Sequence, residues 1–333
     1  MFCGIGQEEE GLKMLDMIII DGLSFALPLF IMAIGGIYSE KSGVTNLALE
    51  GFQGFGAFTG AFAAVYLAGI FGQTSQVPYY AGFLCAVIGG GVFALLHALL
   101  CIKFKADQVI SGVVMNILAM ALTSFLTKSI NESLFGSAAN KFSLGASTRI
   151  TFPGLSDIPT AGAIFTDVYP FEILIVIIAV VMWYVLYKTV YGMRLRACGD
   201  NPHSADAAGI NVYRVRTLAV FISGCLSGIA GMSFAYSVSA NFSPDIYLGY
   251  GYLSIAALIF GNWSILPSLF ACLIFGFARS GGAAIINQLG LPSAYNDLVR
   301  ILPYMLTLLL LVFFSKHNHS PRALGQVYDK GRR

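Results

Sequence analysis

The chain is poor in charged residues. Of its 333 residues only 11% are Asp, Glu, Lys or Arg, whereas 57% are hydrophobic and the mean hydropathy is +0.76. Because soluble domains carry roughly 25% charged residues, this composition excludes an ordinary soluble protein and indicates a membrane protein. The formal net charge of only +2 gives no sign of a nucleic-acid partner.

Several motifs are also missing. The six cysteines form no C-x-x-C pair and mostly lie inside apolar runs, so we interpret them as small buried hydrophobic residues and expect no metal site and no cofactor. No G-x-x-x-x-G-K-[ST] occurs, which excludes ATP binding through a P-loop. No cleavable signal peptide is evident.

Long apolar runs, by contrast, are abundant. A transmembrane helix needs about 20 mostly apolar residues. The 44–71 run is interrupted by glycines and the 247–280 run is broken at "GNWSILP"; such breaks are tolerated only inside protein or beside a water-filled cavity. We predict an all-α, polytopic transmembrane helical bundle of eight to ten spans with broken or re-entrant helices. The candidate segments are 17–38, 44–71, 79–102, 108–127, 170–187, 217–236, 247–260, 265–280 and 298–314.

Lysine and arginine are unevenly divided between the two sides of this bundle. If residues 188–216 lie inside the cell, 13 of the 19 lysines and arginines, including those of this loop, lie inside. Positively charged loops are retained in the cytoplasm, so we predict a cytoplasmic C-terminus and, for nine spans, an outer N-terminus. Residues 1–333 then form a single transmembrane domain, with 128–169 as its largest outer loop.

The inner loop 188–216 contains the sequence "YGMRLRACGDNPHSADAAGINVYRVR". Asn201 suits the N-cap of a helix, Pro202 its first position and Gly209 the position just past its end. The pattern predicts a helix of about two turns, which is marginal on its own in water. We therefore expect this helix to dock against a partner.

Charged side chains in the same loop allow two further interpretations. The flanking arginines are expected to anchor the loop to the inner lipid headgroups; they are Arg194, Arg196, Arg214 and Arg216. Asp200, His203 and Asp206 recur at intervals of three, as an acid–base or metal site would need. A histidine among carboxylates on a short loop is more often a capping or surface residue, so we favour docking over an integral-membrane enzyme.

A carboxylate stands inside the apolar stretch "EKSGVTNLALEGFQGFGAFTGAFAAVYLAGIF", residues 40–71. On a helix Asn46, Glu50 and Gln53 share one face. A carboxylate in a membrane segment is costly and normally faces the bundle interior or a water-filled cavity. Two interpretations stay open: the polar stripe lines a solute path, or it bonds to backbone freed by a helix break.

Other residues of the apolar segments are candidates for the same path. Asn116, in "VISGVVMNILAM", either joins helices or contacts solute. Phe52 is a candidate to stack on a flat solute ring, although packing is the commoner role of such a residue. Gly56 and Gly60 form a G-x-x-x-G pair, which suits close helix packing.

The stretches "GIYSEKSGVTNLALEGFQGFGAF", "VISGVVMNILA", "YGMRLRACGDNPHSADAAGINVYRVR" and "PRALGQVYDKGRR" together resemble a known family. They are similar to the permease subunits of bacterial ABC importers of the branched-chain amino acid and ribose type, and within that group to the nucleoside and simple-sugar branch. The resemblance covers residues 18–333, and the order and spacing of the motifs make it specific.

The resemblance implies a permease, and no enzyme, in the bacterial cytoplasmic membrane. Its implied partners are an ABC ATPase subunit that hydrolyses ATP, a second related permease forming a heterodimer, membrane lipid and an extracytoplasmic solute-binding lipoprotein. The implied solute is a nucleoside, a simple sugar or riboflavin, moved by alternating access. The implied coupling helix contacts the ATPase through Asp200, Asn201, Pro202, His203, Ser204, Ala205, Asp206 and Gly209.

One residue departs from the family pattern, and one alternative function remains. Arg279, in "FGFARSGG", places a cation near the outer end of a span, so either the boundary of that span or the polarity of the outer mouth differs from expectation. The alternative is an ion- or proton-coupled carrier in which Glu50 takes up the proton. Such a carrier has no need of a capped inner helix.

Overall fold

The apolar runs fold as helices, because a helix satisfies its own backbone hydrogen bonds within the run. The computed structural model describes residues 3–72, 75–145, 147–156, 158, 161–246, 248–290, 292, 295–314 and 319–331. Its α-helices are α1 (Cys3–Lys41), α2 (Leu49–Phe71), α3 (Val77–Ala98), α4 (Gln108–Phe135), α5 (Pro170–Lys188), α6 (Val190–Asp200), α7 (Pro202–Ala207), α8 (Val212–Phe234), α9 (Tyr250–Phe260), α10 (Ile265–Gln288) and α11 (Asn296–Phe314).

A few shorter elements complete the fold. Two π-helical turns, Leu99–Lys103 and Ala235–Ser239, prolong α3 and α8, and the 3-10 helix Ala161–Phe165 precedes α5. The short strands β1 (Phe142–Ser143) and β2 (Asn241–Phe242) pair antiparallel.

The prediction of a polytopic helical bundle is confirmed. Among the described residues, seven helices are long and apolar enough to cross a membrane; they are Met14–Lys41, Leu49–Phe71, Val77–Lys103, Gln108–Phe135, Pro170–Lys188, Val212–Ser239 and Ile265–Gln288. The segment predicted at 247–260 is α9, an apolar helix of only 11 residues. The predicted break at "GNWSILP" is the turn between α9 and α10, so the discontinuous helix is confirmed.

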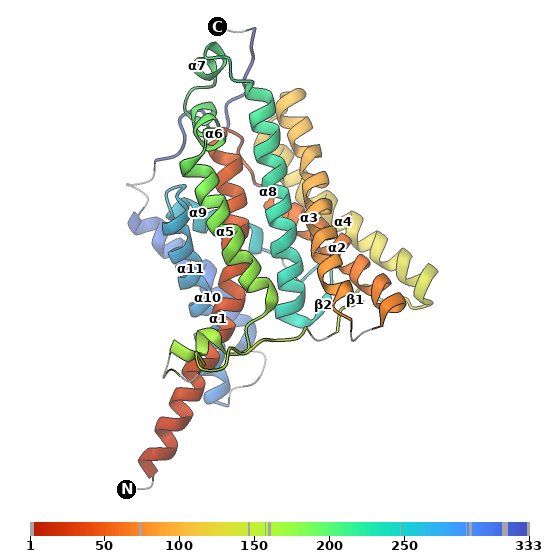
Figure 1. The fold of residues 1–333 in the computed structure, drawn as a ribbon, viewed down its shortest axis with the longest axis vertical. Helices are drawn as coiled ribbons and strands as arrows, with labels where there is room; N and C mark the ends of the chain where they lie inside the picture. Colours follow the sequence, from red (N-terminus) through yellow and green to blue (C-terminus); the bar gives the residue numbers. More distant parts are fainter. Residues whose placement is uncertain are drawn as a thin grey trace.

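The bundle has two distinct ends (Figure 1). We call one the α7 end, because α6, α7 and the C-terminal residues 319–331 lie there. We call the other the β1–β2 end, because both strands and the start of α1 lie there. Helix α1 runs from the β1–β2 end to the α7 end, and α8 runs back. The two chain termini therefore lie at opposite ends, as nine alternating spans predict.

Helices α2, α3 and α8 meet at glycines. A Cβ atom added to Gly56 would lie 2.5 Å from Gly228 Cα and 2.9 Å from Ala86 O, and one added to Gly60 would lie 2.6 Å from Gly82 O. Real side chains do not fit at such distances, so the absence of a side chain permits the close approach. The prediction that Gly56 and Gly60 serve close helix packing is confirmed.

Candidate functional site

The chain between α1 and α2, residues 42–48, forms a non-helical turn inside the protein. We call it the α1–α2 turn. Side chains of other helices bond to its backbone: Gln108 Oε1 accepts a hydrogen bond from Thr45 N at 2.7 Å, and His97 Nε2 lies 3.4 Å from Thr45 O. Irregular backbone is stable at such a place only when protein groups replace water as its partners.

Asn46 fastens this turn to α8. It is fully buried; its Nδ2 donates to Ser223 Oγ at 2.9 Å and its Oδ1 accepts from Ala48 N at 3.1 Å. Both ends of the amide are therefore occupied by the protein. These contacts fit the interpretation in which the polar stripe supports a helix break.

Asn116 completes the start of α2 from the neighbouring helix α4. The first N–H groups of a helix have no partner within it, and Asn116 Oδ1 accepts one of them, Gly51 N, at 2.8 Å. Its Nδ2 donates to Leu47 O at 2.8 Å and to Tyr252 Oη at 3.2 Å. Asn116 thus joins α2, α4 and α9, which is the helix-joining role considered for it from the sequence.

Glu50 bonds to the start of the short helix α9. Its Oε2 accepts a hydrogen bond from Gly249 N at 2.9 Å, and Gly249 is the N-cap residue of α9 with a left-handed φ of 90°. A negative charge at a helix N-terminus is favourable, because the N–H groups there point outward and have no intrahelical acceptor. The carboxylate in the apolar segment thus stabilises a helix that begins inside the bundle.

A cavity of about 190 Å³ adjoins the same carboxylate. It takes its polar groups from Glu50, Asn116 and Tyr252, and the remaining lining residues are Gly54, Ile117, Ala119, Met120, Pro244 and Leu248. Glu50 and Asn116 therefore have structural partners and also line a cavity. The two interpretations of Glu50 from the sequence are compatible with each other.

Phe52 and Gln53, the remaining residues of the sequence-predicted path, are fully buried. The Phe52 ring meets the rings of Phe93 and His97 edge-on, with centroids 6.5 and 5.9 Å away. Neither amide atom of Gln53 has a hydrogen-bond partner within the described parts of the chain. The prediction that Asn46 shares a helix face with Glu50 and Gln53 is wrong, because α2 begins only at Leu49 and Asn46 lies in the α1–α2 turn. The contacts of Phe52 are those of a packing residue.

A second buried carboxylate, overlooked in the sequence, joins α1 to the end of α9. Glu40 is 4% exposed, and its Oε2 accepts a hydrogen bond from Trp263 Nε1 at 2.5 Å. Its Oε1 lies 3.5 Å from Asn46 N. The sequence did contain a signal for Glu40, because this carboxylate follows an apolar run just as Glu50 stands within one. Its partner Trp263 is 223 positions away, so nothing in the local sequence predicts their contact.

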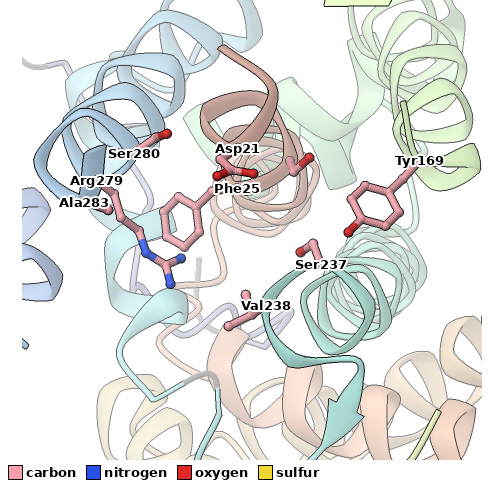
Figure 2. Close-up of a pocket in the computed structure, with 10 residues that line it drawn as sticks. Asp21, Phe25, Tyr169, Ser237, Val238, Arg279, Ser280 and Ala283 are labelled. Atoms are coloured by element: carbon pink, nitrogen blue, oxygen red, sulfur yellow. The ribbon is translucent and has the colours of Figure 1, made fainter. Parts of the chain in front are cut away.

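A larger polar cavity, about 230 Å³, lies toward the β1–β2 end (Figure 2). Its lining comes from α1, α10, the π-helical turn that prolongs α8 and the residue just before α5. The residues are Asp21, Ser24, Phe25, Tyr169, Ser237, Val238, Gly276, Arg279, Ser280 and Ala283. Sequence reasoning singled out only Arg279 among them. We call this cavity the mouth pocket.

The structure explains the unusual Arg279. Helix α10 continues to Gln288, so the span end predicted at residue 280 was too early and Arg279 lies within the helix. Its guanidinium lies 4.1 Å from the ring centroid of Phe25 and 5.5 Å from that of Tyr250, which are favourable cation–π distances. The cation is held against aromatic faces while it lines a polar pocket.

Several polar groups of the mouth pocket are fixed by neighbours. Ser24 Oγ donates to Glu172 Oε1 at 2.5 Å, and Arg149 Nη2 donates to Tyr169 Oη at 2.8 Å. Ser237 Oγ is buried and has no hydrogen-bond partner in the described chain. The pocket therefore presents an unpaired hydroxyl, a carboxylate and a guanidinium beside an aromatic ring.

At the α7 end, the short helix predicted in the inner loop is confirmed. Asn201 is its N-cap, and Asn201 Oδ1 accepts a hydrogen bond from Ser204 N at 3.0 Å. Pro202 occupies the first turn, and Gly209 has a left-handed φ of 80° just past the end. The capping residues were sufficient to predict this helix from the sequence, because each of them acts within a few residues.

The two faces of α7 differ. Pro202 and Ala205 are buried, whereas Asp200, Asn201, His203, Ser204 and Gly209 are exposed and Asp206 is half-buried. The buried face packs in a small cluster made by Cys198, Ala205, Val212 and Tyr328. Burial raises the pKa of the Cys198 thiol, so it stays protonated at neutral pH.

Two of the charged residues in this loop contact the C-terminal segment of the chain. The ring of His203 packs against that of Tyr328, with centroids 5.3 Å apart, and Asp206 Oδ1 lies 3.6 Å from Lys330 Nζ. Within the described residues, no group of three or more His, Cys, Asp or Glu side chains is arranged to hold a metal ion.

One of the four flanking arginines does not reach the headgroup zone. Arg216 is only 2% exposed; its Nε donates to Ser42 O and its Nη1 to Gln326 O, both at 3.0 Å. The prediction of a lipid anchor is wrong for Arg216, because α8 already begins at Val212 and the face of that helix with Val212 and Arg216 is buried in the protein. Arg194 and Arg214 are exposed.

Comparison with known proteins agrees with this architecture. Residues 18–311 match the family described as branched-chain amino acid transport system, permease component. The chain belongs to this family. The permease is also similar to known ABC transporter permease proteins along nearly its whole length.

Three relatives show the extent of the similarity. The guanosine ABC transporter permease protein NupQ of Bacillus subtilis (strain 168) is 38% identical over 329 residues, covering 96% of this chain and 99% of NupQ. The nucleoside ABC transporter permease protein NupC of Lactococcus lactis subsp. cremoris is 35% identical, covering 96% and 98%. The putative glucose ABC transporter permease protein TsgC13 of Haloferax volcanii is 29% identical, covering 92% and 95%.

Family membership decides the class of activity. The protein is a multi-pass membrane permease of an ABC transporter and not its catalytic subunit, so ATP hydrolysis belongs to a separate partner. The missing P-loop is thereby explained. The proton-coupled carrier gains no support, and the hydrogen bond from Gly249 gives Glu50 a role that involves no proton transfer.

Proposed function

We propose that this permease imports a nucleoside-like solute, either a nucleoside or a simple sugar, by alternating access driven by an ABC ATPase. The observation that carries the proposal is α7. This helix has only six residues and lies at the tip of one end of the bundle (Figure 1). A helix so short is not stable alone in water, and its exposed polar face is free to enter a partner.

The ATPase docks on the exposed face of α7 in this proposal. Asn201 shapes the start of the helix, while Pro202 and Ala205 hold its buried face on the permease. The surface offered to the ATPase consists of Asp200, Asn201, His203, Ser204, Asp206 and Gly209. When ATP closes the ATPase dimer, α7 is displaced, and the helices rock around a central site as in other transporters.

The α7 end faces the cytoplasm in this proposal. Its support is the charge at that end, because positively charged segments are retained in the cytoplasm. The lysines and arginines in the turns, short helices and helix ends there include Lys41, Lys103, Lys105, Arg194, Arg196, Arg214 and Lys330. The C-terminus is then cytoplasmic in a bacterial inner membrane.

The second permease is a related but distinct chain. NupQ and NupP are both guanosine ABC transporter permease proteins of B. subtilis, and they are 38% and 24% identical to this chain. NupC and NupB of L. lactis, at 35% and 24%, repeat this division. We infer that this chain pairs with a permease of the less similar kind, and that a solute-binding lipoprotein docks at the β1–β2 end.

The solute path runs through the mouth pocket and past the cavity beside Glu50. Asp21 and Arg279 offer an acceptor and donors for sugar hydroxyls or ring carbonyls, and Phe25 offers an aromatic face. Ligand sites commonly combine an apolar wall with a few such polar groups. Asn46, Phe52, Gln53 and Asn116 keep the walls of the inner cavity in place, and Glu50 and Asn116 contact the solute as it passes.

Ala205→Pro tests the coupling assignment. Ala205 N donates to Asn201 O at 3.1 Å, and proline removes this bond from α7. We expect the complete transporter, reconstituted in vesicles with its ATPase and binding protein, to hydrolyse ATP without solute uptake. Ala208→Ser, on the exposed side, is the matched control. Normal uptake in the Ala205→Pro variant contradicts the proposal.

The solute is tested on the binding lipoprotein by calorimetry. Guanosine, glucose and riboflavin are the probes, since each carries hydroxyls and two of them a flat ring. Binding of guanosine or glucose supports the proposal. Binding of riboflavin alone, or of none of the three, contradicts it.

A further inference from the structure

The C-terminal residues 319–331 lie across the α7 end, and we call them the C-terminal strap. Ala323 N donates to Gly199 O, near the end of α6, at 2.8 Å. Gly325 N donates to Gly43 O, in the α1–α2 turn, at 3.2 Å. The backbone of the strap is thus bonded on one side to the segment before α7 and on the other to the start of the α1–α2 turn.

The side chain of Tyr328 enters the small cluster beneath α7. It is 4% exposed, and its ring lies 5.2 Å from that of Tyr213 and 5.3 Å from that of His203. Ala205, the buried residue of α7, belongs to the same cluster. A residue more than a hundred positions later in the chain therefore covers the apolar face of α7.

Charged groups tie the strap to the same neighbours and to one more. Lys330 Nζ lies 3.6 Å from Asp206 Oδ1 on α7. Asp329 Oδ2 lies 2.7 Å from Lys105 Nζ, in the turn between α3 and α4. Each exposed ion pair contributes little free energy. The main effect of these two pairs is therefore to fix the position of the strap relative to α7 and to the turn between α3 and α4.

The buried side chain of Arg216 joins the strap to the α1–α2 turn. Its buried guanidinium donates to Gln326 O of the strap and to Ser42 O of the α1–α2 turn. The strap also reaches the turn between α9 and α10, because His319 N donates to Asn262 Oδ1 at 2.7 Å. The strap therefore bonds to the elements around α7 and also to the α1–α2 turn and the α9–α10 turn. These two turns contain Asn46 and Trp263, the hydrogen-bonding neighbours of Glu40.

These contacts leave α7 little freedom to move alone. A helix of six residues gains its stability from what covers it, and here the cover is Tyr328. A force that displaces α7 must carry the strap along or break the cluster. Through the strap the displacement reaches the α1–α2 turn, which contains Asn46, the residue whose N–H lies 3.5 Å from Glu40 Oε1.

We propose that the C-terminal strap is the second half of the coupling device and that it transmits the displacement of α7 to the α1–α2 turn. The proposal rests on the docking of an ATPase to α7 proposed above. It assigns Tyr328 and Arg216 as positioning residues that act through α7 and touch neither solute nor nucleotide.

Tyr328→Ala in the complete reconstituted transporter tests the proposal, with Tyr328→Phe as the control that keeps the ring. We expect the ATPase to remain bound and active while the solute imported per ATP hydrolysed falls by roughly 2- to 30-fold, the range produced by perturbing one link of a coupling network. Tyr328→Phe restores the ratio. An unchanged ratio in Tyr328→Ala overturns the proposal, and so does loss of the bound ATPase, because the strap then only braces the docking site.

The two assignments fail separately. If α7 is not the docking helix, Ala205→Pro leaves uptake normal. If only the strap is misassigned, Ala205→Pro abolishes uptake whereas Tyr328→Ala does not change the ratio of uptake to hydrolysis.

Discussion

The carboxylate of Glu50, at the start of α2, accepts a hydrogen bond from the backbone N–H of Gly249, 199 positions later, at 2.9 Å. This bond holds the start of α9 inside the bundle. Glu40 holds the other end of the same helix through Trp263. Two carboxylates ten positions apart thus position a helix of 11 residues that is too short to cross the membrane alone.

Glu50→Gln should retain most of the uptake, because a glutamine oxygen accepts the same hydrogen bond and the transport needs no proton. Glu50→Leu should lower the free energy of unfolding by about 1–3 kcal/mol, since the Gly249 N–H is left without its partner. Uptake in vesicles and thermal unfolding in detergent measure the two effects. Loss of uptake in a stably folded Glu50→Gln variant, together with transport by the unaltered protein that a pH gradient drives without ATP, would point instead to a carrier.

Trp263→Phe should destabilise the permease by about 1–3 kcal/mol, because it removes an N–H donor from the buried carboxylate of Glu40. Glu40→Gln is the matched control, since it keeps an acceptor for the indole and removes the buried charge. Thermal unfolding of the purified chain compares the two. Equal stability of Trp263→Phe and the unaltered protein would show that the contact contributes little.

Gly228→Ala should destabilise the bundle by about 1–3 kcal/mol, because the added methyl group meets the backbone of α3 at Ala86 and overpacks the joint between the helices. Gly69→Ala is the control, since nothing lies within 4 Å of a Cβ placed there. The control should be neutral or slightly stabilising, as alanine is the better helix former. Similar unfolding temperatures for both variants would contradict the packing described here.

Arg279→Gln should raise the KM for uptake by roughly 10-fold or more, if removing one charged hydrogen-bonding group from the mouth pocket costs about 1.5–3 kcal/mol of solute affinity. Arg279→Lys, which keeps the charge but loses the planar group stacked on Phe25, should have an intermediate effect. Initial uptake rates at several solute concentrations test this. An unchanged KM with a normal maximal rate would remove the mouth pocket from the solute path.

Features that depend on near neighbours could be predicted from the sequence alone. Apolar runs specify spans because each helix satisfies its backbone within the run, and Asn201, Pro202 and Gly209 specify α7 because capping acts within one turn. The cost of charge in a membrane likewise directed Glu50 to the interior before its partner was known.

The partners of the buried polar groups, by contrast, could be identified only from the packed helices. Gly249 for Glu50, Trp263 for Glu40, Ser223 for Asn46 and Tyr328 for α7 are all distant in the chain. Arg216 was wrongly predicted to be a lipid anchor, because the burial of a side chain depends on which remote residues pack over it. A hydrogen bond between remote residues leaves no periodic pattern in either segment, so it cannot be predicted from the sequence of either one. It is seen only when the helices are packed.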